Sequence, residues 1–280
     1  MKQAFFLTFR VLAAYGALAA GVWFLALSVN WIEAPDRREM LWISAGGDPQ
    51  VPLVVIDAGH GGADRGAAAN RLIEKEAALD IACRLQHKLE ASGVRVQMTR
   101  QDDSFLSLDQ RAQIANESGA SAFISVHLNT SGSGTTDGRG IETYFCGSKS
   151  LSAVRQIRES LNIADAGGLQ DLRGKNLAEV IQRITCARTQ AANRGVKSKN
   201  YTVIHSTACP SVLVECGFMT DAAEATTLRR EDYREKLAGG VSEGVCAFLQ
   251  AQSMKPKRGI ILEAPKPEAA ATANELAVSD

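Results

Sequence analysis

The sequence predicts a single α/β domain with one mostly parallel mixed sheet of about six strands and helices on both faces. Short β-branched apolar runs alternate along the chain with segments of helical apolar spacing. Several of these runs are apolar at nearly every position, as in strands buried on both faces. The 280 residues are 45% apolar and carry 31 basic and 31 acidic side chains. This composition excludes a disordered or collagen-like chain, and the zero net charge without a basic aromatic stripe argues against nucleic-acid binding.

The first 32 residues are predicted to be a transmembrane or signal helix. Residues 11–32 carry no charge and are long enough to cross a bilayer, and Lys2 and Arg10 precede them. We favour an uncleaved signal-anchor, although Ala26 to Ser28 resembles a signal cleavage site. The remainder is then exported: it is extracytoplasmic, in a periplasm, and tethered to the cytoplasmic membrane, or it is secreted after cleavage.

Composition also predicts where the linker, the folded domain and the C-terminal tail begin and end. Residues 33–50 contain two prolines and two adjacent glycines and form a short linker. The folded domain is expected over 51–251, and residues 252–280, rich in Ala, Pro and charge, are expected to form a mobile tail.

The first half of the domain begins with a buried strand that ends in a tight glycine-rich loop. Residues 51–58 (VPLVVIDA) form this strand and GHGG follows it. Apolar residues at helical spacing predict a helix over 74–93, with Gly93 as its stop. Strands are predicted at 94–98 and 122–128, and between them Ser107 and Gln110 have the spacing of a capping box.

The second half is predicted to continue the alternation. A Ser/Gly/Thr-rich loop follows Asn129, and further strands are expected at 140–146, 201–206 and 211–218. Two helical patterns occupy 150–195, separated by AGGLQDLRG, and a last helix runs over 221–250 with a break around 228–232. The six cysteines have no Cys-x-x-Cys spacing, so buried free thiols are expected, with one disulfide as the alternative.

Residues with metal-site chemistry gather where the strands end. His60 follows the first strand, His127 closes the third, Glu215 lies in the last, and Glu74 opens the first helix. Ligands of such sheets bind beyond the carboxyl ends of the strands. Two imidazoles and one carboxylate with an open position are typical of catalytic zinc, with a fourth polar residue as base. The other two histidines, His87 and His205, lack this context and receive no role.

These residues lie in segments that resemble the zinc-dependent N-acetylmuramoyl-L-alanine amidases of the Amidase_3 type. The matching segments, in order, are VVIDAGHGGADRGA (54–67), LIEKEAALDIACRL (72–85), VRVQMTRQDDSFLSLDQRAQIAN (94–116), SAFISVHLN (121–129), GRGIETYF (138–145) and SVLVECGFMTD (211–221). Together they span most of the predicted domain.

The resemblance implies that His60, Glu74 and His127 bind Zn²⁺ and that Glu215 is the catalytic carboxylate. Glu76 competes with Glu74 as a ligand, but residues two apart on a helix point about 200° from each other, so only one can face the metal. The family pattern favours Glu74.

Three further residues are candidates with weaker support. Asp57 is a candidate hydrogen-bond partner of a ligating imidazole, or else an Asp that caps the turn. Asn129 and Arg139 are candidates for substrate contact, or else ordinary loop residues.

The resemblance implies hydrolysis of the amide between the lactyl group of N-acetylmuramic acid and L-alanine in peptidoglycan, for cell wall remodelling and in some members daughter-cell separation. Two alternatives remain: a zinc peptidase that cuts wall peptides, and a membrane-tethered wall-binding scaffold without activity. Some division amidases carry an inserted helix that covers the zinc, so residues 150–172 are a candidate plug. An activator protein is then a possible partner.

Overall fold

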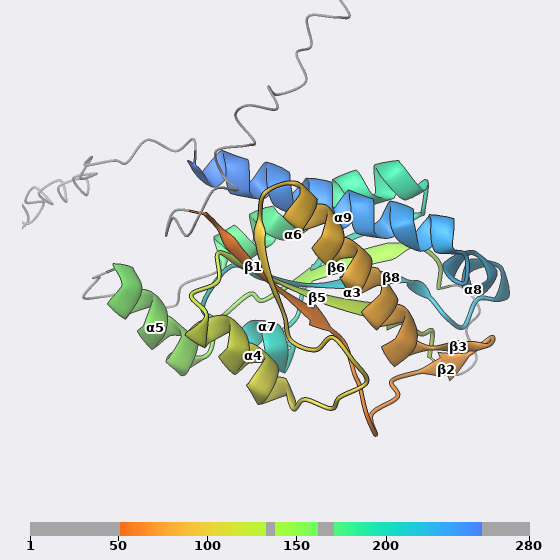
Figure 1. Ribbon diagram of the computed structural model, residues 1–280, viewed down its shortest axis with the longest axis horizontal. Coiled ribbons are helices and arrows are strands. Elements are labelled where there is room, and N and C mark those ends of the chain that lie inside the picture. The colour runs from red at the N-terminus through yellow and green to blue at the C-terminus, as the bar shows by residue number, and fades with distance from the viewer. Residues whose placement is uncertain (1–50, 133–137, 162–170, 254–280) are drawn as a thin grey trace, which may run out of the picture.

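One mixed six-stranded sheet organises the computed structural model, which describes residues 51–132, 138–161 and 171–253 (Figure 1). The strand order is β4-β1-β5-β8-β6-β7. The strands are β1 (Leu53–Ala58), β4 (Arg95–Met98), β5 (Ala122–Asn129), β6 (Ile141–Phe145), β7 (Asn193–Ser198) and β8 (Ser211–Phe218). All neighbours pair in parallel except β6 and β8, which are antiparallel. The predicted mostly parallel mixed sheet is confirmed.

Helices cover both faces of this sheet. They are α3 (Glu74–Ala91), α4 (Leu108–Glu117), α5 (Leu151–Leu161), α6 (Leu172–Thr189), α7 (Thr202–His205), α8 (Ala222–Leu228) and α9 (Glu231–Ser253). Helices α3, α6 and α9 pack together on one face, and α4 and α7 contact each other on the opposite face. A short hairpin of β2 (Ala68–Ala69) and β3 (Leu72–Ile73) leads into α3.

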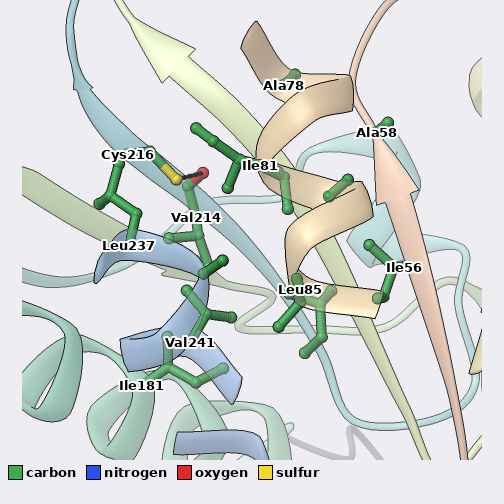
Figure 2. Packing of buried hydrophobic residues seen from close by; sticks show 14 of the residues in the cluster. Ile56, Ala58, Ala78, Ile81, Leu85, Ile181, Val214, Cys216, Leu237 and Val241 are labelled. Carbon is green, nitrogen blue, oxygen red and sulfur yellow. Dashed lines mark hydrogen bonds between the residues drawn. The ribbon is translucent and has the colours of Figure 1, made fainter. Parts of the chain in front are cut away.

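The larger core lies between the sheet and α3, α6 and α9, and Figure 2 shows its centre. Ile56 of β1 and Val214 of β8 point from the strands toward Ile81 and Leu85 of α3 and Val241 of α9. Each of these five side chains is completely buried. Fully burying such a side chain contributes about 1.5–3 kcal/mol, so this layer fixes the strands whose ends carry the site.

The predicted capping box, helix stop and helix break are confirmed. Ser107 and Gln110 form the expected capping box at the start of α4. Gly93, with φ of +78°, follows the end of α3, a conformation that favours glycine. The expected break in the last helix separates α8 from α9.

Two elements near residue 200 differ from the prediction. Residues 201–206, predicted as a strand, contain the one-turn helix α7, whose Val203 and Ile204 are buried. A single turn is too short to show a helical period. Residues 193–198, predicted within a helix and its end, form β7. As an edge strand β7 is half exposed, so it lacks the continuous apolar run of a buried strand.

Helix α5, in the described part of the candidate plug at 150–172, lies away from the site, so this part does not cover the candidate ligands. Gln156 of α5 donates to the carbonyl oxygen of Asn116, near the end of α4. Gln156 also lines a cavity with Ser121 and Pro210, which precede β5 and β8. The described part of the segment 150–172 therefore lies at the amino ends of these strands, whereas the candidate ligands lie at their carboxyl ends. Residues 162–170 lie outside the described part.

The remaining predictions concern the chain ends and the cysteines. The predicted anchor at 1–32, the linker at 33–50 and residues 254–280 of the predicted tail lie outside the described residues; α9 itself extends to Ser253. Within the described ranges, no helix has the length and apolar character needed to cross a membrane. All six cysteines are described and all are free thiols, as expected.

Candidate metal centre and active site

His60, Glu74 and His127 come together at the carboxyl ends of β1 and β5. His60 lies in the loop after β1, Glu74 is the first residue of α3, and His127 lies in β5. The Oε1 atom of Glu74 is 3.0 Å from Nε2 of His60 and 3.0 Å from Nδ1 of His127. One ligand atom from each residue lies within 4.8 Å of the others. Two imidazole nitrogens and one carboxylate oxygen that converge in this way form a donor set that could hold a metal ion.

The loop that carries His60 has an unusual backbone conformation. His60 has φ of +59°, in the left-handed region that a side chain with a Cβ rarely occupies. Buried Arg111 donates to the carbonyl oxygens of His60 and Ala58 at 2.7 Å. Buried Arg100 donates to the carbonyl oxygens of Ala58 and Gly59 at 2.9 and 2.7 Å. These guanidinium contacts hold the loop in place and orient the His60 imidazole.

Asp64, and not Asp57, is the carboxylate beside the His60 ring. Its Oδ2 lies 2.8 Å from Nδ1 of His60, which leaves Nε2 directed at Glu74. Asp57 was a candidate for this contact, or for capping the turn. It is instead fully buried and accepts hydrogen bonds from the side chains of Thr99, Ser125 and Arg111. Asp57 therefore holds neighbouring elements together beneath the site.

The carboxylate of Glu74 is held in its charged form. Only 5% of the residue is exposed, and Glu76 of the same turn faces solvent, as the helical geometry predicts. Burial opposes ionisation of Glu74, but hydrogen bonds from both imidazoles and from the Ala67 amide outweigh it and hold the pKa well below its usual range. Burial likewise disfavours the charged form of His60, yet Glu74 and Asp64 raise the pKa of its imidazole.

Glycines leave room for the two imidazole rings. A Cβ at Gly59 would lie 2.4 Å from Cε1 of His127, and a Cβ at Gly66 would lie 2.6 Å from Cδ2 of His60. Gly66 also has φ of +61°. The backbone therefore approaches both rings so closely that only glycine fits without displacing them.

Glu215 of β8 lies directly beside His127. The two residues are register partners on neighbouring parallel strands, so their side chains leave the same face of the sheet. Oε2 of Glu215 is buried without a hydrogen-bond partner in the described structure. Burial raises the pKa of Glu215 to about 7, and the nearby charges of Glu74 and Glu142 act in the same direction.

These residues line one cavity of about 420 Å³. Its lining residues are His60, Glu74, Leu108, His127, Leu128, Asn129, Thr130, Asn200, Tyr201, Thr202, Val203, Leu213 and Glu215. Asn129, a candidate for substrate contact, is thus placed at the cavity. Arg139 is not among the lining residues: its side chain is 62% exposed and pairs with Asp221 at 2.9 Å.

Comparison with known proteins identifies the family. A family model described as N-acetylmuramoyl-L-alanine amidase (Amidase_3) matches residues 54–247. The chain belongs to this family. The amidase LytC of Bacillus subtilis is 36% identical over 197 residues, which cover 70% of this chain and 35% of LytC. The chain therefore spans only about a third of the length of that relative.

Solved amidase structures have the same fold. The crystal structure of N-acetylmuramoyl-L-alanine amidase from Clostridium difficile 630 has a TM-score of 0.62 and 31% identity, covering 72% of this chain and 98% of that one. The CwlD amidase from Clostridioides difficile, solved in complex with the GerS lipoprotein, has a TM-score of 0.60 and 28% identity, covering 71% and 99%. The family is metal-dependent, in agreement with the donor set described above.

Sequence reasoning assigned no role to several residues around the site. Arg100, Arg111 and Asp64 lie in the quoted family segments, but a buried arginine cannot be distinguished from a surface one in such a pattern. Glu142 is also buried, beside Glu215 across the antiparallel β6–β8 pair. The only sequence feature that could have indicated a role for Glu142 was its charge within the otherwise apolar run GIETYFC.

Proposed function

We propose that this domain hydrolyses the amide between the lactyl group of N-acetylmuramic acid and L-alanine in peptidoglycan, with Zn²⁺ as cofactor. The observation that carries the proposal is the position of Glu215, with its Oε2 buried, beside a converging His60, Glu74 and His127 donor set in one cavity. Family membership supports the choice of bond, because the family's description names that amidase activity.

The residues present fit a catalytic metal. Three protein ligands leave one coordination position open, whereas structural zinc sites are closed by four ligands and favour cysteine. The unpartnered, buried Oε2 of Glu215 also indicates that a further polar group belongs in the cavity. Zinc bound by His60, Glu74 and His127 would polarise the scissile carbonyl and make a water molecule more acidic.

Glu215 would act as the general base and then as the general acid. Its carboxylate takes a proton from the attacking water as the water oxygen bonds to the carbonyl carbon. It then gives that proton to the amide nitrogen as the carbon–nitrogen bond breaks, which releases the L-alanine amine and the lactyl carboxylate. A pKa of about 7 suits both transfers, because neither the protonated nor the charged form is scarce near neutral pH.

The surrounding residues would hold this machinery in place. Asp64 orients the His60 ring, and Arg100 and Arg111 hold the loop that carries it. Asn129, Asn200 and Tyr201 on the cavity wall would contact the sugar or the peptide. Arg139 would stabilise the rim through Asp221 rather than bind substrate.

The same function places the domain outside the cytoplasm, where peptidoglycan lies. We propose that residues 1–32 tether it to the cytoplasmic membrane, that residues 33–50 link the tether to the domain, and that the domain acts in wall remodelling, including daughter-cell separation. The solved complex of the CwlD amidase with a lipoprotein supports a protein partner for this chain, and we propose that such a partner activates it.

The decisive experiment is metal analysis of residues 33–280 combined with release of peptides from purified peptidoglycan. We expect about one zinc per chain, and new L-alanine amines matched by intact lactyl carboxylates. Release of amines from other residues would indicate a zinc peptidase. Metal binding without cleavage of either bond would favour a wall-binding scaffold.

A further inference from the structure

We propose that Arg194, Lys197 and Lys199, here called the basic strip, bind the carboxylates of the peptidoglycan stem peptide. This proposal rests on the proposed function, because it concerns the peptide that leaves the scissile amide. The strip lies on β7 and just after it, at the edge of the sheet.

The basic strip adjoins the active-site cavity, because Lys199 contacts Tyr201, which lines the cavity. His127, Glu215 and Glu142 are register partners across β5, β8 and β6, so all three side chains leave the same face of the sheet. Arg194 and Lys197 of the next strand both form ion pairs with Glu142. The row of charged groups thus runs from the metal ligands across the sheet to its edge.

Each of the three cations lies against an aromatic ring. The Lys197 ammonium lies 5.9 Å from the Tyr144 ring centre. The Arg194 guanidinium lies 4.8 Å from the Phe218 ring centre, and the Lys199 ammonium lies 4.5 Å from that of Tyr201. Tyr201 itself lines the cavity. Cation–π contacts of this kind hold a long side chain extended while its charge stays available to a ligand.

The charges of the strip do not cancel. Glu142 is 2% exposed and is the one carboxylate paired with the strip in the described structure. The Arg194 and Lys197 side chains remain 35% and 42% exposed. The Lys199 ammonium donates to the uncharged hydroxyl of Tyr201. Three cations beside one buried carboxylate leave an excess of positive charge that faces solvent, which is a binding site for anions.

The distance also suits a stem peptide. Three strand spacings of about 4.8 Å separate His127 on β5 from the strip on β7, or roughly 14 Å. An extended chain covers this distance in about four residues, at about 3.3–3.6 Å each. Stem peptides have this length, and their γ-linked glutamate and their C-terminus carry free carboxylates.

The test uses two synthetic muramoyl stem peptides that differ at one group. One has a free C-terminal carboxylate on its fourth residue, and the other has a carboxamide there. With the full-length, zinc-loaded protein we expect a KM about tenfold lower for the acid than for the amide, with similar kcat, since one charge-assisted hydrogen bond is lost. The Arg194→Gln and Lys197→Gln variants should raise the KM for the acid and leave that for the amide unchanged.

Two controls separate binding from folding. Arg230→Gln removes an exposed arginine that pairs with Asp232, away from the strip, and should leave the preference intact. Arg194→Lys retains the charge and should retain most of the preference. A thermal unfolding midpoint for each variant shows whether Glu142 still folds into place.

Binding of the free peptides, followed by calorimetry, separates this proposal from the proposed function. The wild type could cleave neither substrate and still bind the acidic peptide more tightly than the amide, with a preference that depends on Arg194. In that case the amidase proposal fails and the proposed role of the basic strip is supported. Equal KM and equal binding for the two peptides would overturn the proposed role of the basic strip. A preference for the acid that persists in the triple variant Arg194→Gln, Lys197→Gln, Lys199→Gln would also overturn it.

Discussion

Glu215 stands opposite His127 in the register of two neighbouring parallel strands, β5 and β8. The position of the proposed base relative to a proposed metal ligand is therefore fixed by backbone hydrogen bonds of the sheet. Both strands are buried and pack against the main core, so neither can shift without exposing apolar side chains. Sites placed on such elements keep their geometry better than sites on loops.

Replacement of this carboxylate tests its role directly. Glu215→Gln keeps the size of the side chain but removes its ability to accept a proton. We expect peptide release from peptidoglycan to fall by about 10²–10⁴-fold, with the bound-metal content unchanged. Activity above a tenth of wild type at full metal occupancy would show that another group moves the proton.

The first turn of α3 contains two glutamates that serve as test and control for metal binding. Glu74 is buried against both imidazoles, whereas Glu76 faces solvent. Glu74→Gln should remove most of the bound zinc, as measured by metal analysis after dialysis, and Glu76→Gln should retain it. Equal zinc in both variants would contradict the assignment of Glu74.

Gly59 tests whether the backbone must lie close to the His127 ring. An added Cβ would lie 2.4 Å from that ring, whose Nδ1 contacts Glu74. Displaced ligands lose metal affinity, so we expect Gly59→Ala to weaken zinc binding by about 10–100-fold in competition with a chelator. Gly132→Ala is the control, because a Cβ there would meet nothing within 4 Å; the two variants should differ clearly.

The buried elements and the candidate site could be predicted from the sequence because each leaves a local signal. Continuous apolar runs marked the buried strands, and polar residues at their ends marked His60, His127 and Glu215. The edge strand β7 and the one-turn α7 have no such signal, since both depend on neighbours distant in sequence. The same reason explains why Asp57 was misjudged: its partner Arg111 is far along the chain.

The metal-free protein should become less stable as the pH rises from 5.5 to 8. Burial raises the pKa of Glu215 from 4.5 to about 7, so the folded state holds a proton that the unfolded state has already released. Folding stability from this group is present below about pH 4.5 and is lost as the pH rises through about 7, a loss of about 3 kcal/mol in all, of which about 2 kcal/mol falls between pH 5.5 and 8. His60, whose pKa is also raised, acts in the same direction.

Denaturant unfolding of the chelated protein at both pH values measures this effect. Glu215→Gln cannot titrate, so its loss of stability over this range should be clearly smaller than that of the wild type. An equal pH dependence in the two proteins would show that Glu215 does not hold a proton in the folded metal-free state.

A buried ion pair closes the segment that contains α5. Lys149 precedes α5 and Asp171 caps the start of α6, and their side chains meet at 2.9 Å. The Lys149 ammonium also donates to Ser211 Oγ and to the carbonyl oxygen of Ile204. Both side chains are less than a tenth exposed, so removal of one partner would leave the other charge buried and unpaired.

We therefore expect Lys149→Met to lower the free energy of unfolding by about 3–5 kcal/mol and to leave kcat of the folded protein unchanged. Addition of Asp171→Asn removes the orphaned charge while keeping an N-cap residue on α6, so the double variant should regain part of that stability. Urea unfolding of the wild type, both single variants and the double variant gives the coupling between the two residues. A double variant that loses the sum of the two single effects would mean that the pair does not interact, and α5 would then be attached to the domain by its hydrogen bonds alone.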